Sequence, residues 1–295
     1  MSLPSPTQEA AARAAQRSTD DHAGSAGDSI TIRRLATLEE FLEACTIQEE
    51  TWGAGFSERV PGAILNVAQR IGGVTAAAFG PDGRMLGFVF GLTGFKDGKL
   101  VHWSDMLAVR VEARGRHLGD RLKHFQRLRC LEIGVESMLW TFDPLVARNA
   151  HFNINRLGAR AAEYAADMYG SNTGSTLHGM MPTDRIIASW ELRGATPLAD
   201  VPEHVRRAPV HRDAPIVTPL DDAGRPAFVE ADAPVVLVQI PRDIQEVRLA
   251  DPSLALAWRH ATRAALVSYM ERGYTVTGFD RGASGSLPAY VMTRA

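Results

Sequence analysis

Cysteines, surplus charge and long apolar runs are scarce in this sequence, and each scarcity excludes a class of protein. Two cysteines occur among 295 residues, Cys45 and Cys130, and their spacing fits neither a disulfide framework nor a metal site. The formal net charge of −2 argues against broad nucleic-acid binding, because that binding needs a basic surface. No apolar run approaches the roughly 18 residues of a membrane span, and no signal-peptide pattern opens the chain. We therefore expect a cytoplasmic protein that binds neither nucleic acid nor membrane and carries no metal.

Composition divides the chain into four segments. Residues 1–29 are rich in Ala, Ser, Gly and Asp, with Leu3 as the one large aliphatic residue. Such a segment cannot bury enough apolar surface to offset its ordering entropy, so a disordered tail is predicted. Residues 30–193 alternate strand and helix patterns and are expected to form the main domain. Residues 194–233 are rich in Pro, Asp, Ala and Arg and predict a linker, and residues 234–295 predict a second ordered part.

The pattern most indicative of function lies between Leu107 and Leu122. An apolar strand ending at Val109 is followed by a polar turn with Gly115 and then by a helix that opens at about His117. The first amide groups of a helix lack partners inside it, and the helix dipole adds partial positive charge there. This order therefore predicts an anion site suited to phosphate. The basic side chains expected to deepen its positive field are Arg114, Arg116, Arg121 and Lys123.

The strands around this helix follow a definite order. Strands are expected at 30–35, 74–79, 85–92 and 100–109, and turn sequences at 80–83 and 97–98 join the last three as two hairpins. After the helix, further elements are expected at 138–142 (a strand parallel to 100–109, because a helix connects them), 147–157 (a helix), 161–168 and 186–192 (strands).

Two helices are expected between the first and second strands. One begins after Thr37, which forms a capping box with Glu40, and the other begins at Pro61. Each of these helices, and the helix at the phosphate site, carries an apolar stripe that is expected to be buried. In the helix after Thr37 the stripe is Leu38, Phe41, Leu42 and Cys45, and in the helix that begins at Pro61 it is Ile64, Leu65, Ala68 and Ile71. In the phosphate-site helix it is Leu118, Leu122, Phe125 and Leu128.

The segment Val109-Arg-Val-Glu-Ala-Arg-Gly-Arg-His-Leu-Gly-Asp-Arg-Leu122 resembles the acyl-CoA signature of the GNAT superfamily of acyltransferases. Arg114 and Gly119 occupy signature positions, whereas His117 stands where the family usually has its first glycine. The downstream segment Leu139-Trp-Thr-Phe-Asp-Pro144 resembles a poorly characterised branch of predicted acetyltransferases. The resemblance implies an α/β (α+β) fold with a mixed, mostly antiparallel sheet and helices on both faces. It also implies that the C-terminal part is a β-α-β-β extension.

The resemblance implies an acyl-CoA-dependent N-acyltransferase, with acetyl-CoA or another acyl-CoA as cosubstrate and a small-molecule or protein amine as acceptor. The residues it implies in cofactor binding are Leu107, Ala108 and Val109 through the strand backbone, Arg114, Gly115, Arg116, His117, Leu118, Gly119 and Asp120 around the diphosphate, and Asn149. The Val109 amide would also donate to the oxyanion. For Asn149 the alternative is a simple helix cap.

Asp105 is the candidate general base for removing a proton from the acceptor ammonium. It shares a strand face with Leu107 and Val109, because side chains alternate along a strand. The alternative is a polar residue at a solvent-facing position. Family members often carry a tyrosine as general acid in the helix after the fifth strand, but Ile154 holds that place. Tyr164 and Tyr169 lie further along the chain and are not assigned the role.

Several alternatives stay open. The second hypothesis for function is a catalytically weak acyl-CoA-binding regulatory protein, and the third is a scaffold with a vestigial phosphate loop. Acceptor specificity is expected in residues 52–62 and in the polar loop 170–181, where Trp52 and Phe56 either wall the acceptor pocket or pack in the core. In the C-terminal part, a strand, two helices and two strands either extend the first sheet or mediate formation of a homodimer.

Overall fold

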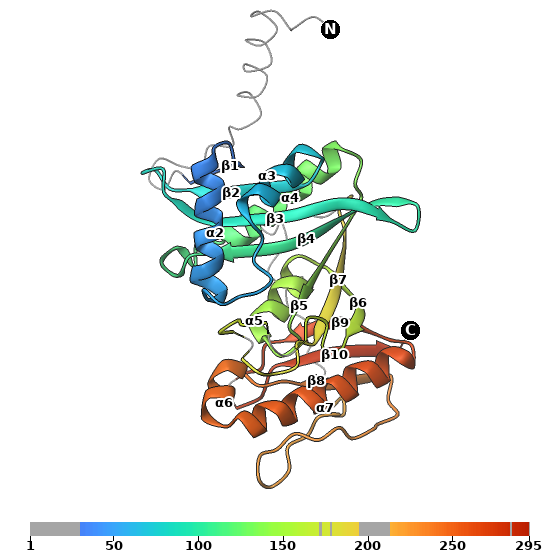
Figure 1. Cartoon of the computed structure of the whole chain (residues 1–295). Coiled ribbons are helices and arrows are strands. Elements are labelled where there is room, and N and C mark those ends of the chain that lie inside the picture. The colour runs from blue at the N-terminus through green and yellow to red at the C-terminus, as the bar shows by residue number, and fades with distance from the viewer. Residues whose placement is uncertain (1–29, 171–172, 178, 195–212, 284, 295) are drawn as a thin grey trace, which may run out of the picture.

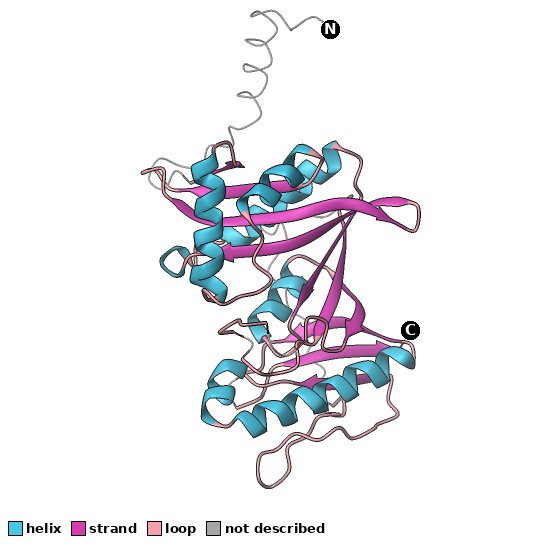
Figure 2. Ribbon diagram, in the orientation of Figure 1, coloured by secondary structure: helices cyan, strands magenta, loops and turns pink. Residues whose placement is uncertain are grey.

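The computed structural model describes residues 30–170, 173–177, 179–194, 213–283 and 285–294. The predicted tail at 1–29 and part of the predicted linker, 195–212, lie outside these residues. The described chain contains two β-sheets and the helices that cover them (Figures 1 and 2).

The first sheet has seven strands in the order β1-β2-β3-β4-β5-β7-β6. Their bounds are β1 Thr31–Arg34, β2 Val74–Phe79, β3 Met85–Lys96, β4 Lys99–Val109, β5 Ser137–Phe142, β6 Arg160–Ala165 and β7 Arg185–Glu191. β4 and β5 run parallel, and the other neighbouring pairs run antiparallel. The predicted hairpins, the parallel crossover and the mixed, mostly antiparallel sheet are therefore confirmed.

Helices cover both faces of this sheet. The bounds are α2 Leu38–Trp52, α3 Gly62–Arg70, η1 Val111–Ala113, α4 Leu118–Glu132 and α5 Ala147–Ala150, which continues as the wide helical turn η2 His151–Arg156. Side chains alternate along β2, so Ala76 and Ala78 pack in the hydrophobic cluster with α4, whereas Ala77 and Phe79 pack in the cluster with α2 and α3. The sheet thus lies between two apolar layers.

The predicted buried stripes are partly wrong. Phe41 and Leu65 are buried, but Leu38 is 66% exposed and Ile71 is 73% exposed. Leu42, Ile64 and Leu128 are exposed as well. The reason is that α2 and α4 carry apolar residues on more than one side, and the sheet selects one of them. On α2 the selected side holds Phe41, Ala44, Ile47 and Gln48.

An irregularity in β4 shapes the centre of the molecule. Met106 pairs with Phe90 and Ser104 pairs with Gly91, so Asp105 is an extra residue with no partner on β3. Such a bulge bends a strand and increases its twist. β4 pairs with β5 along Val101–Trp103, and beyond that point the two strands separate, as Figure 1 shows. A wedge therefore opens between them.

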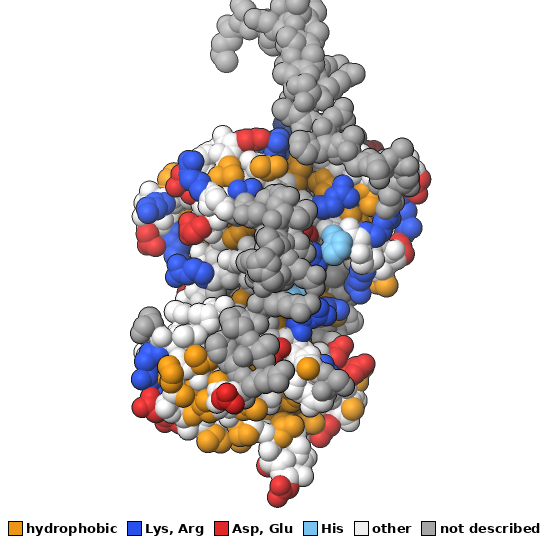
Figure 3. Space-filling view, turned by 180° about the vertical axis from the view of Figure 1, so that it is seen from behind, with side chains coloured by type: hydrophobic (Ala, Val, Ile, Leu, Met, Phe, Trp, Pro, Cys, Tyr) orange, Lys and Arg blue, Asp and Glu red, His pale blue; other side chains and the backbone are white. Residues whose placement is uncertain are grey.

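The C-terminal part forms a sheet of its own. Its elements are β8 Val235–Gln239, α6 Ile244–Ala250, α7 Pro252–Glu271, β9 Tyr274–Asp280 and β10 Ala289–Arg294, with the strand order β8-β10-β9. The expected element order is present, but the three strands pair with one another and not with the first sheet. Within the described residues, extension of the first sheet is therefore the wrong alternative. The homodimer stays a prediction, and Figure 3 shows hydrophobic side chains gathered on this part.

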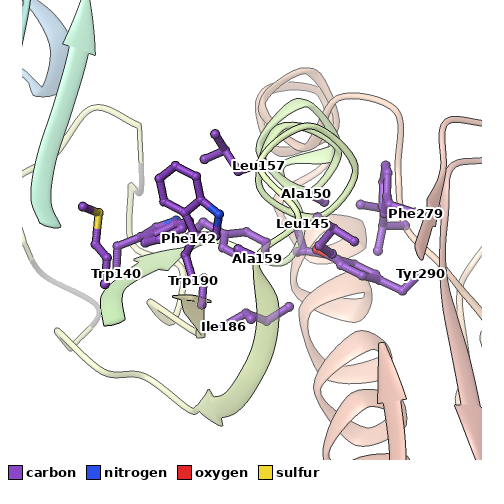
Figure 4. Packing of buried hydrophobic residues seen from close by; sticks show 14 of the residues in the cluster. Trp140, Phe142, Leu145, Ala150, Leu157, Ala159, Ile186, Trp190, Phe279 and Tyr290 are labelled. Carbon is purple, nitrogen blue, oxygen red and sulfur yellow. The ribbon is translucent and has the colours of Figure 1, made fainter. Parts of the chain in front are cut away.

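One hydrophobic cluster joins the two sheets. Figure 4 shows Phe279 and Tyr290 of the second sheet beside Leu145 and Ala150, and Trp140 and Trp190 on the other side of the same cluster. Polar contacts seal the junction, because the Tyr290 hydroxyl donates to the Pro144 carbonyl at 2.7 Å. The Asn155 amide also exchanges hydrogen bonds of 2.7 and 3.0 Å with the Phe279 backbone. The C-terminal part is thereby fixed against α5 and η2.

Candidate functional site

A groove of about 690 Å³ runs along the N-terminal end of α4, and we call it the α4 groove. Ten of the predicted cofactor residues line it: Leu107, Ala108, Val109, Arg114, Gly115, His117, Leu118, Gly119, Asp120 and Asn149. Three of the basic residues that were expected to add positive charge at this site do not line the groove. Arg116 is not among the lining residues, Arg121 donates to the Ile30 carbonyl at 2.8 Å, and Lys123 is buried elsewhere. Spacing on a helix does not by itself decide which basic residues reach its N-terminus.

His117 caps α4 in the left-handed conformation, with φ of 57°. A residue with a Cβ adopts this conformation at a cost of about 1–2 kcal/mol, which explains why glycine suits the position. Its Nδ1 lies 2.8 Å from Nη2 of Arg156. Because arginine can only donate, His117 accepts this hydrogen bond through Nδ1. The ring is thus tied to η2 on the opposite side of the groove.

The α4 groove is strongly cationic. The arginines that line it are Arg114, Arg148, Arg156, Arg242 and Arg281, against one carboxylate, Asp120. Burial, followed by the charges of Arg281 and Arg156, lowers the pKa of His151 to about 4, so this histidine is neutral beside them. Arg242 and Arg281 come from the C-terminal part, and no local sequence pattern connects them with the phosphate loop. The groove is suited to a ligand with several negative charges.

A second cavity of about 320 Å³ fills the space where β4 and β5 separate, and we call it the wedge pocket. It shares its lining with the α4 groove at Trp52, Leu107, Arg148, Asn149, Phe152 and Leu177, so the two cavities meet there. The rings of Trp52 and Phe56 stack with their centroids 5.6 Å apart and wall the pocket. The loop expected to hold specificity also contributes, since Thr173 lines the pocket.

Parts of that loop are held in place by both halves of the molecule. The Ser57 amide donates to the Thr173 carbonyl at 2.9 Å, and the Thr176 amide donates to the Trp52 carbonyl at 3.0 Å. From the C-terminal part, the Gln245 side-chain amide donates to the Leu177 carbonyl at 2.9 Å. The pocket is therefore enclosed by segments far apart in the sequence.

Asp105 lies at the mouth of the wedge pocket, at the bulge in β4. Its side chain keeps contact with solvent yet is crowded by protein atoms. This crowding raises the pKa of the Asp105 carboxyl group, and the negative charge of Glu58 raises it further. A hydrogen bond from Trp103 lowers the pKa and offsets part of this rise. A carboxylate with a raised pKa is well placed to accept a proton. The structure thus brings Asp105 beside Leu107, where the two cavities meet.

A buried chain of hydrogen bonds ends in the same pocket. The Lys123 ammonium donates to Ser104 Oγ at 2.7 Å, and the Ser104 hydroxyl donates to Gln126 Oε1 at 2.8 Å. Gln126 Nε2 lies 3.0 Å from His102 Nε2, and His102 Nδ1 lies 2.9 Å from Thr93 Oγ1. The chain ends where the Thr93 hydroxyl donates to the Gly72 carbonyl at 2.7 Å. Burial and then the charge of Lys123 lower the pKa of His102 to about 3, so its ring is neutral. Each member can then donate to the next, and the direction of the whole chain is fixed.

Lys123 is 2% exposed and lines the wedge pocket. Its Nζ lies 3.9 Å from the centre of the Trp140 ring and donates to Ser104. Burial lowers its pKa to about 7, against a small opposing effect of Cys130. Sequence reasoning placed Lys123 in the field of the phosphate loop. The signal for its true position is that Lys123, Gln126 and Cys130 follow one another at helical spacing on the buried side of α4.

Tyr169 supplies a hydroxyl to the wedge pocket that sequence reasoning did not assign. Its Oη lies 3.3 Å from Thr141 Oγ1 of β5. Ile154 is buried in the hydrophobic cluster, and Tyr164 instead donates to Asp184 at 2.5 Å. Distance along the chain was therefore a poor guide to Tyr169.

No family model and no curated protein sequence matches this chain. Among solved structures, it is similar to an N-acetyltransferase from Staphylococcus aureus Mu50, with 14% identity, a TM-score of 0.44, and coverage of 56% of this chain and 99% of that one. It is also similar to the ribosomal-protein-S18-alanine N-acetyltransferase of Escherichia coli, with 18% identity, a TM-score of 0.43, and coverage of 57% and 97%. A third similar structure is Arabidopsis thaliana Naa50 in complex with a bisubstrate analogue, with 14% identity, a TM-score of 0.43, and coverage of 55% of this chain and 97% of that one. Likenesses of this size assign no activity to the chain.

No group of three or more His, Cys, Asp or Glu side chains in the described part of the chain could hold a metal ion. None of its helices is long and apolar enough to cross a membrane.

Proposed function

We propose that this protein is an acyl-CoA-dependent N-acyltransferase of the GNAT type. The observation that carries the proposal is that a cationic groove at a helix N-terminus opens, beside Leu107, into a pocket with a carboxylate at its mouth. Acyl transfer to an amine needs this pairing of a polyanion site and a proton acceptor. The expected acyl donor is acetyl-CoA, the expected acceptor is a small or protein amine, and the expected location is the cytoplasm.

The diphosphate of the donor is expected at the amides of Leu118, Gly119 and Asp120, with Arg114 beside it. The pantetheine arm needs donors and acceptors of its own. β5 leaves β4 after Trp103, so the backbone of residues 107–109 has no strand partner on that side among the described strands. A free strand edge of this kind is a suitable partner for the amide groups of pantetheine. Asn149 lies where the two cavities meet and is expected to contact the same arm.

In the proposed reaction, Asp105 accepts a proton from the acceptor ammonium. The free amine then attacks the thioester carbonyl, a C–N bond forms, and the Val109 amide donates to the oxyanion. The C–S bond breaks, and the leaving thiolate takes a proton from the Tyr169 hydroxyl or from water. Asn149 can position the donor but cannot supply this proton, because an amide is not an acid at neutral pH.

One observation favours a second candidate, a catalytically weak acyl-CoA-binding regulatory protein. His117 and Arg156 are joined across the α4 groove, and Ile154 occupies the place of the family's usual tyrosine. Both features are compatible with ligand binding and unfavourable for fast turnover. The two candidates differ in whether acyl-CoA is consumed in the presence of an amine.

The test is calorimetric titration of the purified protein with acetyl-CoA and with CoA. We expect Arg114→Ala and Gly119→Glu to weaken binding by at least about tenfold, since each removes or adds a charge at the phosphate site. The matched controls are Arg193→Ala, which removes an exposed arginine paired with Glu136, and Gly119→Ala. A Cβ at Gly119 would meet the Leu107 side chain at an ordinary 3.7 Å, so this control folds normally. Absence of binding to the wild-type protein would refute the proposal.

A further inference from the structure

The wedge pocket contains a buried lysine that the proposed reaction does not use. Lys123 is 2% exposed and touches neutral groups: Ser104 Oγ at 2.7 Å, the Trp140 ring at 3.9 Å and Met138 Sδ at 3.9 Å. Burying an ammonium group without a carboxylate is expensive, and protein cores seldom retain one unless it has a use. A pocket that opens onto this group offers a site for a negatively charged substrate group.

Buried ion pairs lie at the neighbouring end of β5. Arg259 donates to both oxygens of Asp143, at 2.9 and 2.7 Å, and Arg185 lies 3.8 Å from the same carboxylate. Two guanidinium groups therefore meet one carboxylate. The next acidic residue, Asp184, already pairs with Arg263. Asp143 and Arg185 both line the wedge pocket, so a buried guanidinium group and its carboxylate partner form part of its wall.

The mouth of the pocket has the opposite sign. Asp105 and Glu58 both line it, and the charge of Glu58 acts on Asp105. Ser104, which holds Lys123, is adjacent to Asp105 on β4, and both residues line the pocket. A small molecule could contact both Lys123 and Asp105 at once.

We propose that the wedge pocket selects an acceptor that carries a carboxylate as well as its amine, as a free amino acid does, and that Lys123 binds this carboxylate. The inference rests on the proposed acyltransferase function and specifies its acceptor class. The acceptor ammonium lies between Asp105 and Glu58 at the mouth, where the donor thioester arrives from the α4 groove. The carboxylate lies at depth against Lys123. A protein amine lacks such a carboxylate beside the reacting nitrogen and is disfavoured.

The experiment measures CoA release from acetyl-CoA with a panel of L-amino acids and the amines that result from their decarboxylation. The expected result is that at least one amino acid has a kcat/KM at least about tenfold above that of its decarboxylated partner, the low end of the range for a charged hydrogen bond. Lys123→Met should abolish this preference, so that the ratio of the two kcat/KM values falls to about one. Lys123→Arg, which keeps the cation, should retain part of it.

A second measurement needs no turnover. The N-acetylated form of the preferred amino acid should bind to the CoA complex of the wild-type protein, and binding should fall at least about tenfold in Lys123→Met. The N-acetylated amine should bind both proteins equally.

Three results would overturn the inference. The first is equal turnover of amino acids and amines, and the second is an equal loss for both acceptors in Lys123→Met. The third is binding of acetyl-CoA without turnover of any amino acid in the panel. Failure of the proposed function looks different, because the wild-type protein then binds neither acetyl-CoA nor CoA.

Discussion

Replacing Lys123 by methionine should make the protein more stable and should change how its stability depends on pH. Lys123 has a pKa of about 7 in the folded protein, compared with the ordinary value of 10.5 that it regains on unfolding. Between these two values the unfolded chain binds a proton at Lys123 and the folded chain does not. Because stability rises with pH wherever the unfolded state binds more protons, this contribution is complete above 10.5 and is lost as pH falls to about 7.

The size follows from the linkage relation. One pKa unit corresponds to about 1.4 kcal/mol, so Lys123 should add about 2 kcal/mol to the free energy of unfolding between pH 7 and pH 9. Lys123→Met removes this slope. At pH 7 the variant should be more stable by about 1–4 kcal/mol, after allowance for the lost hydrogen bond to Ser104. Methionine has a similar length and is readily accommodated in a core.

The assay is urea denaturation of both proteins at pH 7, 8 and 9, and the quantity of interest is the difference between their slopes. This difference cancels the contributions of other titrating groups that the two proteins share. Lys99→Met in the exposed β3–β4 hairpin is the matched control and should follow the wild-type protein. Parallel slopes for wild type and Lys123→Met would refute the assigned burial of the ammonium group. A variant more stable than wild type yet poorer with carboxylate-bearing acceptors would show a functional residue retained against stability.

Three more predictions concern single positions. His117→Gly should stabilise the protein slightly in urea denaturation. Relief of about 1–2 kcal/mol of left-handed backbone strain outweighs the greater freedom of glycine in the unfolded chain, which costs about 0.4–1 kcal/mol. A clear destabilisation would mean that the hydrogen bond to Arg156 contributes more than the strain. Gly91→Ala should lower the melting temperature strongly, because its Cβ would lie 2.2 Å from His102 Nε2 and 2.6 Å from the Trp103 carbonyl, whereas Gly94→Ala, with nothing within 4 Å, should not. Asp105→Asn should abolish turnover but keep acetyl-CoA binding. In the wild-type protein, kcat/KM should fall as pH drops through the raised pKa of Asp105. Unchanged kinetics in the Asp105→Asn variant would remove Asp105 from the mechanism.

Much of the first sheet could be predicted because its signals are local. The Asp97–Gly98 turn forces a hairpin, with φ of 53° and 74° at the two residues, and the sequence after Val109 carries its own turn and helix start. The exposure of Leu38 was not predictable, since it depends on which side of α2 meets the sheet. Arg242 and Arg281 were missed for the same kind of reason. They reach the α4 groove only because the second sheet packs against η2, and that packing is a tertiary event.

The bulge at Asp105 explains why the candidate site could be located from the sequence while its architecture could not. A strict alternation along β4 predicts the face of Asp105 but gives no reason for a cavity there. One extra residue ends the pairing of β4 with β5 after Trp103, and three consequences follow from it. The wedge pocket opens, the strand edge at 107–109 becomes available to a donor, and Asp105 stands at the opening. The close approach of His102 and Gln126 to Gly91 fixes the opposite strand at the same level. Gln126 also holds Ser104, and through it Lys123. The wedge pocket, the free strand edge and the position of Asp105 therefore depend on one local irregularity, so a change that repaired the bulge should remove all three together.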